Sequence, residues 1–148
     1  MADTPFKRIL VGTLGSPWSQ RALELAVNMA KAYRIELVVV AVLTPAYVPE
    51  KKAPFGIGAV SRPDENMRQL AQGVLEKAAS LAQANGIKAV CELREGRVAD
   101  EILKSAEGYR CDLIIIGSRG QRESSHVTLG EAGNEVVRKA PVPVMVVK

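Results

Sequence analysis

Apolar stretches of strand length alternate along this chain with longer segments in which apolar residues recur every three to four positions. The strand-length stretches lie at residues 6–13, 36–43, 87–94, 112–117 and 141–148, and the helical-period segments lie at 17–34, 63–85, 98–107 and 130–139. Such alternation is typical of a parallel sheet that is covered by helices. We therefore predict an α/β fold with a single doubly wound parallel five-stranded sheet and helices on both faces, flavodoxin-like in broad architecture.

Several local signals set the limits of these elements. Ser16 offers an N-cap hydroxyl and Pro17 suits the first helical position, so a helix should begin there. Residues 36–43, ELVVVAVL, form a continuous apolar run, which predicts a strand that is buried on both faces. Residues 44–62 carry three prolines and two glycines, so we expect no regular element there. A loop of that length acts as a lid or a binding loop or is partly disordered, and its apolar side chains, Tyr47, Phe55 and Ile57, favour docking on a surface.

The composition narrows the class of protein. A chain of 148 residues suits one domain, and 47% hydrophobic with 24% charged residues is ordinary for a folded, water-exposed protein. The net charge is +4, but the basic residues are scattered and aromatic residues are only 4%, so we expect no nucleic-acid partner. No apolar run approaches the roughly 20 residues that span a bilayer, and no signal peptide is visible, so we expect no membrane association and a cytoplasmic location. Cys91 and Cys111 lack metal-binding or redox spacing and are interpreted as small apolar residues without a disulfide.

Two glycine-containing segments follow predicted strands. Residues 12–16 read GTLGS, and residues 117–133 read GSRGQRESSHVTLGEAG. In a doubly wound sheet, ligands bind at the carboxyl ends of strands where the strand order switches. Gly117, Gly120 and Gly130 match neither a Walker A loop nor a dinucleotide-binding turn. They are either turn formers after a buried strand or glycines that bring backbone amides up to a phosphate.

At these motifs the chain resembles the universal stress protein family, in the branch that binds adenosine nucleotides and carries this glycine spacing. The resemblance covers nearly the whole chain and includes ILVGTLGSPWSQRALELA, GRVADEILKSAEGYRCDLIIIGSRG and APVPVMVVK. It implies that residues 1–148 form one universal stress protein domain, related in architecture to adenine nucleotide alpha hydrolases. Together with the distant Gly130, it favours an anion site over simple turns.

The resemblance also implies which residues bind an adenine nucleotide, whether ATP, ADP or AMP. In these relatives the first loop lines the floor, the Val42 backbone meets the adenine, residues 117–120 hold ribose and phosphate, and residues 130–132 receive the terminal phosphates. The implied nucleotide-binding residues are Gly12, Thr13, Leu14, Val42, Gly117, Ser118, Arg119, Gly120, Gly130, Glu131 and Ala132.

This chain departs from the ATP-binding pattern at two positions. Leu14 stands where relatives have an aspartate near the ligand and its metal, so no metal is assigned, and Glu131 stands where they have a serine or threonine. A carboxylate at residue 131 repels a γ-phosphate, although it is itself favourable at a helix N-terminus. Two alternatives stay open: the pocket takes a nucleotide with fewer phosphates, or it stays empty.

The last predicted strand is apolar on both sides. Val142, Val144 and Val146 lie on one side and Met145 and Val147 on the other. An apolar strand at a sheet edge is a pairing hazard unless it is covered. The resemblance implies the cover, which is antiparallel pairing with the same strand of a second copy in a two-fold homodimer.

We expect a dimeric regulatory binding module with a nucleotide pocket and an unknown protein partner, and not an enzyme. The alternatives are a vestigial pocket on an interaction protein, or slow ATP hydrolysis with Asp112 or Glu131 as the base. Four other side chains, His126, Trp18, Arg119 and Arg122, have simpler interpretations. His126 beside Ser124 and Ser125 lacks an acidic partner and is an exposed loop residue. Trp18 covers the core and is not a stacking platform, and Arg119 and Arg122 either pair with phosphates or are solvated.

Overall fold

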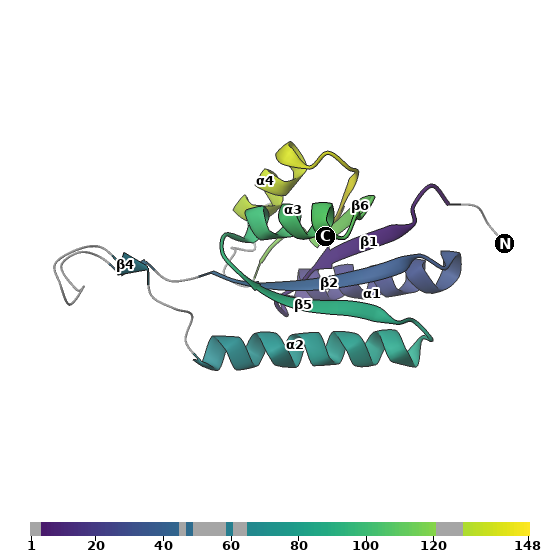
Figure 1. Ribbon diagram of the computed structural model, residues 1–148, viewed down its shortest axis with the longest axis horizontal. Helices are drawn as coiled ribbons and strands as arrows, with labels where there is room; N and C mark the ends of the chain where they lie inside the picture. Colours follow the sequence, from purple (N-terminus) through teal and green to yellow (C-terminus); the bar gives the residue numbers. More distant parts are fainter. Residues whose placement is uncertain (1–3, 45–46, 49–58, 61–64, 121–128) are drawn as a thin grey trace.

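The computed structural model describes residues 4–44, 47–48, 59–60, 65–120 and 129–148. Figure 1 labels its helices and strands. In chain order they are β1 (Arg8–Gly12), α1 (Pro17–Tyr33), β2 (Glu36–Leu43), β3 (Tyr47–Val48), β4 (Ala59–Val60), α2 (Glu65–Ala84), β5 (Ala89–Glu95), α3 (Val98–Gly108), β6 (Leu113–Gly117), α4 (Glu131–Lys139) and β7 (Val144–Val147).

The main sheet has five strands in the order β5-β2-β1-β6-β7, and each neighbouring pair is parallel. The predicted doubly wound parallel sheet is therefore confirmed. The chain first moves outward from β1 to β2 and β5, and then crosses back to β6 on the other side of β1. The strand order thus switches between β1 and β6, and a crevice for a ligand is expected at the carboxyl ends of these two strands.

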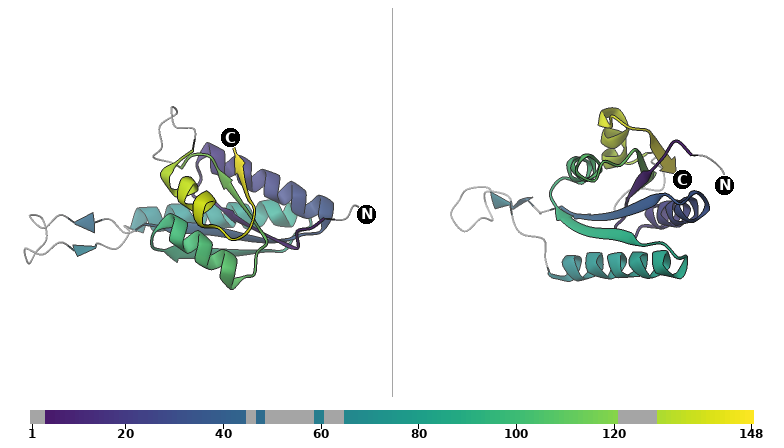
Figure 2. Two further views of the ribbon diagram at one scale, coloured as in Figure 1. Left: turned by 90° about the horizontal axis from the view of Figure 1, so that it is seen from above. Right: turned by 45° about the vertical axis from the view of Figure 1, so that its right-hand side comes forward.

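Two helices cover each face of the sheet. Helices α1 and α2 lie on one face and α3 and α4 on the other, as Figures 1 and 2 show. Every residue of β2 after Glu36 is buried. Its side chains alternate between two cores, with Leu37, Val39, Ala41 and Leu43 on the α1 and α2 side and Val38, Val40 and Val42 on the other. The apolar run of the sequence therefore reflects burial on both faces, as predicted.

Helix α1 begins as the sequence predicts. The Ser16 hydroxyl accepts a hydrogen bond from the Ser19 amide at 3.0 Å, and Pro17 occupies the first turn. Arg34 ends the helix in the left-handed conformation, with φ 56°. None of the described helices is long and apolar enough to cross a membrane.

The expectation that residues 44–62 hold no regular element was wrong at two points. Strands β3 and β4 pair antiparallel, with Tyr47 opposite Val60 and Val48 opposite Ala59. Tyr47 and Val48 stand between two prolines in the sequence and keep their amide hydrogens, so they can pair in a short ladder. The rest of this loop, including Phe55 and Ile57, which were predicted to dock, lies outside the described residues.

Candidate functional site

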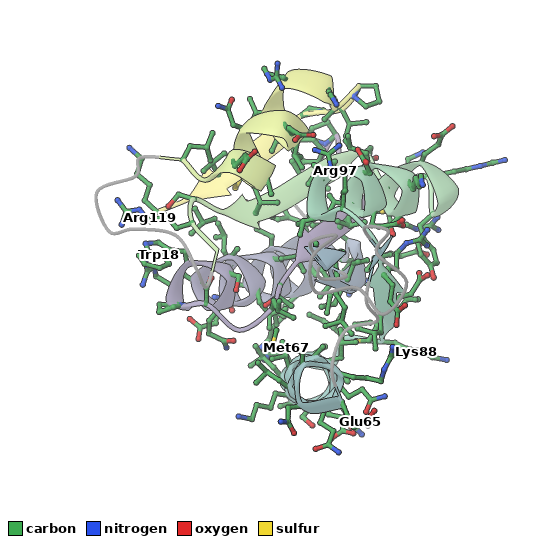
Figure 3. All side chains as sticks on the ribbon, turned by 90° about the vertical axis from the view of Figure 1, so that its left-hand side faces the viewer. Trp18, Glu65, Met67, Lys88, Arg97 and Arg119 are labelled. Carbon is green, nitrogen blue, oxygen red and sulfur yellow. The ribbon has the colours of Figure 1, made fainter. Side chains whose placement is uncertain are left out.

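The two glycine-containing segments lie next to each other at the switch in strand order. Strand β1 ends at Gly12 and β6 ends at Gly117, and these strands are neighbours in the sheet. The Ser16 hydroxyl donates a hydrogen bond to the Arg119 carbonyl at 3.1 Å, across 103 residues of sequence. The structure therefore places residues 12–16 and 117–120 at one end of the sheet, where the sequence predicts the ligand. Figure 3 views the molecule from this end.

Three buried hydroxyl groups hold the first segment in place. The Gly15 amide donates to Thr13 Oγ1 at 3.4 Å, Thr13 Oγ1 donates to Ser19 Oγ at 3.3 Å, and Ser19 Oγ donates to the Ser16 carbonyl at 3.0 Å. The Ser16 hydroxyl has one proton and two acceptors within reach, Ser19 Oγ at 3.0 Å and the Arg119 carbonyl at 3.1 Å, and it can donate to Arg119 because Thr13 already donates to Ser19. Thr13, Ser16 and Ser19 are thereby all hydrogen-bonded, which rigidly joins the loop after β1 to the turn after β6.

Gly117 allows close contact between β6 and α1. A Cβ atom at this position would lie 2.6 Å from the Ser19 nitrogen and 2.6 Å from the Trp18 carbonyl carbon. Both of these are backbone atoms, so they cannot move aside as a flexible side chain would. At Gly12 the nearest atom to a Cβ would be the tip of Ile102, at 2.9 Å. Sequence reasoning treated Gly117 as a turn former or a phosphate contact and missed this packing role.

Two backbone amides that were expected near the ligand are used by the fold. The Ser118 amide donates to the Val147 carbonyl at 2.8 Å, and the Gly130 amide donates to the Ser118 carbonyl at 2.7 Å. Gly130 is the N-cap of α4, and its amide is therefore engaged with Ser118 instead of pointing at a terminal phosphate. The donors that α4 can offer to an anion lie in its first turn, which begins at Glu131. Gly130 thus positions α4 beside the turn after β6.

The backbone of Val42 faces the side of β2 where β1 has ended. The Thr13 amide donates to the Val40 carbonyl at 2.9 Å on the β1 side, and the Gly96 amide donates to the Leu43 carbonyl at 2.9 Å on the β5 side. Backbone groups of successive strand residues point to opposite neighbours, so the N–H and C=O of Val42 point to the β1 side. Pairing with β1 ends at Val40, so these groups lie beyond the end of β1. This direction suits the predicted contact between the Val42 backbone and adenine, which stays a prediction.

Trp18 is half-buried and contacts an arginine of the other glycine-containing segment. The Arg119 guanidinium carbon lies 5.0 Å from the centre of the Trp18 ring, within the range of a cation–π interaction. Figure 3 labels both side chains near the start of α1. The Arg21 guanidinium carbon lies 6.0 Å from the same ring. The interpretation that Trp18 is not a stacking platform was therefore wrong, because the arginine that stacks on it is about a hundred residues away in the sequence.

The two departures from the ATP-binding pattern differ in their surroundings. Leu14 is half-buried and packs against the core on the α1 and α2 side of the sheet. An aliphatic side chain there adds to the core and offers no oxygen to a metal. Within the described ranges, no three His, Cys, Asp or Glu residues gather in a group that could hold a metal ion. Glu131 lies exposed in the first turn of α4.

Asp112 is far from this site, which corrects its assignment as a candidate base for hydrolysis. Its carboxylate accepts hydrogen bonds from the Lys7 amide, the shorter at 2.9 Å, and from the Arg8 amide at 3.1 Å. These residues lie at the amino ends of β1 and β6, the opposite end of the sheet from the crevice. The sequence alone did not distinguish a catalytic from a structural role for the Asp112 carboxylate. In the structure its hydrogen bonds join the start of β1 to the start of β6. Arg122, Ser124, Ser125 and His126 lie outside the described residues.

The two cysteines are free, as predicted. Burial raises the pKa of the Cys111 thiol to about 11, and burial also raises the pKa of the half-buried Cys91 thiol. Both thiols are therefore protonated near neutral pH and lack the thiolate character that redox and metal chemistry needs. Cys91 lies in β5 and Cys111 lies just before β6, and each packs in one of the two cores, which agrees with a packing role.

Comparison with known proteins gives a consistent result. The family model described as the Universal stress protein family matches residues 5–148. A universal stress protein of Methanocaldococcus jannaschii is 31% identical over 97% of this chain and 82% of its own length. A universal stress protein of Thermus aquaticus is 32% identical over 97% of this chain and 99% of its own length.

Solved structures share the fold. The universal stress protein UspA from Lactobacillus plantarum superposes with a TM-score of 0.80 at 23% identity, over 99% of this chain and all of the other. A universal stress protein from Archaeoglobus fulgidus, solved in complex with dAMP, matches with a TM-score of 0.70 at 20% identity, over 98% of this chain and 100% of the other. A universal stress protein solved in complex with cAMP matches with a TM-score of 0.69 at 23% identity, over 98% of each chain. At these identities the likeness shows a common fold.

Proposed function

The chain belongs to the universal stress protein family, and from this we propose that it is a cytoplasmic regulatory module that binds an adenine nucleotide between β1 and β6. The observation that carries the proposal is the junction of residues 12–16 with residues 117–120 at the switch in strand order. The outward-facing backbone of Val42 and the first turn of α4 border the same end of the sheet. Two proteins of the same fold, solved with cAMP and with dAMP, support an adenine ligand with a single phosphate.

The charge at the start of α4 favours a nucleotide with few phosphates. Glu131 places a carboxylate where the resemblance puts the terminal phosphates, and like charges about 5 Å apart repel by about 3 kcal/mol at an effective dielectric constant near 20. Because Glu131 is exposed, water screens it and the cost falls toward about 1 kcal/mol. AMP, whose phosphate is next to the ribose, avoids most of this repulsion. We therefore propose AMP as the preferred ligand class over ATP.

Substituting Glu131 by serine tests this preference. We expect Glu131→Ser to raise ATP affinity by about fivefold and to leave AMP affinity within about twofold, because only the terminal phosphates approach residue 131. Titration calorimetry with AMP, ADP and ATP on both proteins measures these changes. Glu107→Ser is the matched control, since it removes an equal charge from the exposed end of α3, at the opposite end of the sheet.

Each result of these titrations has a separate meaning. Equal and tight ATP binding by the original protein and by Glu131→Ser would refute the electrostatic preference. Binding of none of the three nucleotides would refute the proposed pocket and favour a vestigial one. The engaged Gly130 amide is the observation that favours this second candidate.

We propose that the module acts by binding and not by catalysis. Of the two candidate bases, Asp112 accepts backbone hydrogen bonds at the wrong end of the sheet, and Glu131 is an exposed side chain. A general base must lie within hydrogen-bond reach of the attacking water and be held there in a fixed position. A phosphate-release assay with ATP and magnesium or manganese is expected to give no signal above background.

We also propose that the chain forms a homodimer through β7, with a separate and unidentified protein as its regulatory partner. Pro143 and Val147 direct their carbonyls toward β6, where the Ile114 and Ser118 amides donate at 3.0 Å and 2.8 Å. By alternation along the strand, the backbone groups of Val144 and Val146 point away from the sheet. The four residues of β7 are all half-buried and apolar, and no described strand lies beyond them. Antiparallel pairing with a second β7 would satisfy these groups and bury these side chains.

A further inference from the structure

Two contacts join Arg119, on the turn after β6, to the start of α1. Its backbone carbonyl accepts the hydrogen bond from the buried Ser16 hydroxyl at 3.1 Å. Its guanidinium lies over the Trp18 ring at 5.0 Å. Backbone and side chain are thus both attached to the start of α1, and neither attachment is local in sequence. A long arginine side chain on a turn would otherwise sample many rotamers and would lose more conformational entropy on binding a ligand.

The platform under Arg119 is itself rigid. The Ser16 cap and Pro17 fix the first turn of α1, and the backbone of Trp18 packs directly on Gly117 of β6. The second arginine near the ring, Arg21, donates its Nε hydrogen to the Lys148 carbonyl at 3.0 Å and is thereby directed to the end of the chain. The other guanidinium near Trp18, that of Arg119, belongs to the turn that follows β6, at the switch in strand order.

We propose that Arg119 is the phosphate-binding arm of the nucleotide site and that Trp18 is the positioning residue that holds it. This inference rests on the proposed function and adds to it the origin of discrimination between a nucleotide and a nucleoside. A guanidinium that stacks on an aromatic face keeps its in-plane N–H donors directed outward, in the fork that matches two phosphate oxygens. Stacking and phosphate binding are therefore compatible in one conformation, and Trp18 lowers the entropy lost when the phosphate is bound.

The contribution of Arg119 and Trp18 to phosphate binding is tested by comparing the binding of AMP with that of adenosine, which lacks the phosphate. We expect Arg119→Ala to weaken AMP binding by about tenfold or more and to leave adenosine binding within about twofold. Trp18→Leu should weaken AMP binding by about threefold to fivefold with adenosine unchanged, because leucine fills space without an aromatic face. Trp18→Phe should retain most of the AMP affinity, because it restores that face. Titration calorimetry with AMP and with adenosine measures the affinities of the original protein and of the three variants, and circular dichroism melting confirms that each variant is folded.

A double substitution and a charge control separate positioning from other causes. In the Arg119→Ala background, Trp18→Leu should have no further effect on AMP affinity, because the side chain that it positions is already absent. Arg138→Ala removes an equal charge from the exposed last turn of α4 and should leave AMP affinity unchanged.

Three results would overturn the inference, and one of them also ends the proposed function. If Trp18→Leu lowers AMP and adenosine affinity equally, Trp18 has a general structural role. If AMP binds the original protein and Arg119→Ala with equal affinity, the phosphate-binding role of Arg119 is refuted and the proposed nucleotide site is kept. If the original protein binds neither AMP nor adenosine, the nucleotide site itself is refuted and the arm falls with it.

Discussion

Replacing Gly117 by alanine is expected to lower the free energy of unfolding by about 3 kcal/mol. The added Cβ would lie 2.6 Å from the Ser19 nitrogen and the Trp18 carbonyl carbon and 2.8 Å from the Trp18 carbonyl oxygen. Relief of these contacts requires α1 to move away from β6, because no flexible side chain is available to yield. That movement would disturb the core on the α1 side of the sheet and the Ser16 hydrogen bond to Arg119.

Urea unfolding of the ligand-free protein measures this effect without any contribution from nucleotide binding. Gly73→Ala is the matched control, since Gly73 lies inside α2 and an added Cβ there would meet nothing within 4 Å. Alanine is the better helix former, so this control should gain about 0.5 to 1 kcal/mol. A loss below about 1 kcal/mol for Gly117→Ala would show that β6 and α1 separate easily, and it would return Gly117 to the role of a turn former or phosphate contact.

The parts of the fold that the sequence predicted well depend on short-range signals. Strand β2 has the predicted bounds, 36–43, because its apolar run is bordered by polar residues and its burial on both faces leaves no alternation to misread. The Ser16 and Pro17 pair placed the start of α1, because capping involves only the next three residues. The order of strands followed from neither signal, although the alternation of elements was enough to predict a parallel sheet with helices on both faces.

The parts of the site that were missed depend on contacts across the whole chain. The Gly117 contact with α1 and the Trp18 contact with Arg119 each join segments that are about a hundred residues apart. Asp112 and the Lys7 amide are 105 residues apart in the sequence. A pattern within a window of ten or twenty residues cannot show which backbone a glycine will touch or which ring a cation will cover. The glycine spacing therefore located the site, but it did not explain why each glycine is needed.

Backbone direction along β7 shows which of its amide and carbonyl groups face β6 and which face away from it. Within β7, the carbonyl of Val147 faces β6, and so does that of Pro143 just before the strand. Val146 has the opposite direction, so its amide is not part of the ladder with β6. A substitution that removes only this amide would therefore leave the main sheet paired and would act on whatever lies beyond the edge.

Val146→Pro is such a substitution, and we expect it to weaken the proposed homodimer by about a hundredfold. Proline has no amide hydrogen and is tolerated on edge strands when the missing donor faces outward. In a two-fold interface the change occurs twice, so two hydrogen bonds between subunits are lost. Each loss leaves one carbonyl without its donor and costs about 1 to 1.5 kcal/mol, and the two together give about a hundredfold in the dissociation constant. Sedimentation analysis over a range of protein concentrations measures the dissociation constant, and circular dichroism shows whether the fold is kept.

Val146→Thr is the matched control. It keeps the amide and the β-branched shape, and it replaces one methyl group by a hydroxyl group. It should remain dimeric at concentrations where Val146→Pro is monomeric. If both variants dimerise like the original protein, the interface lies elsewhere, since pairing through β7 requires the Val146 amide. If the original protein is itself monomeric at tens of micromolar, the dimer proposal is refuted, because the half-buried residues of β7 would then be stable at an uncovered edge.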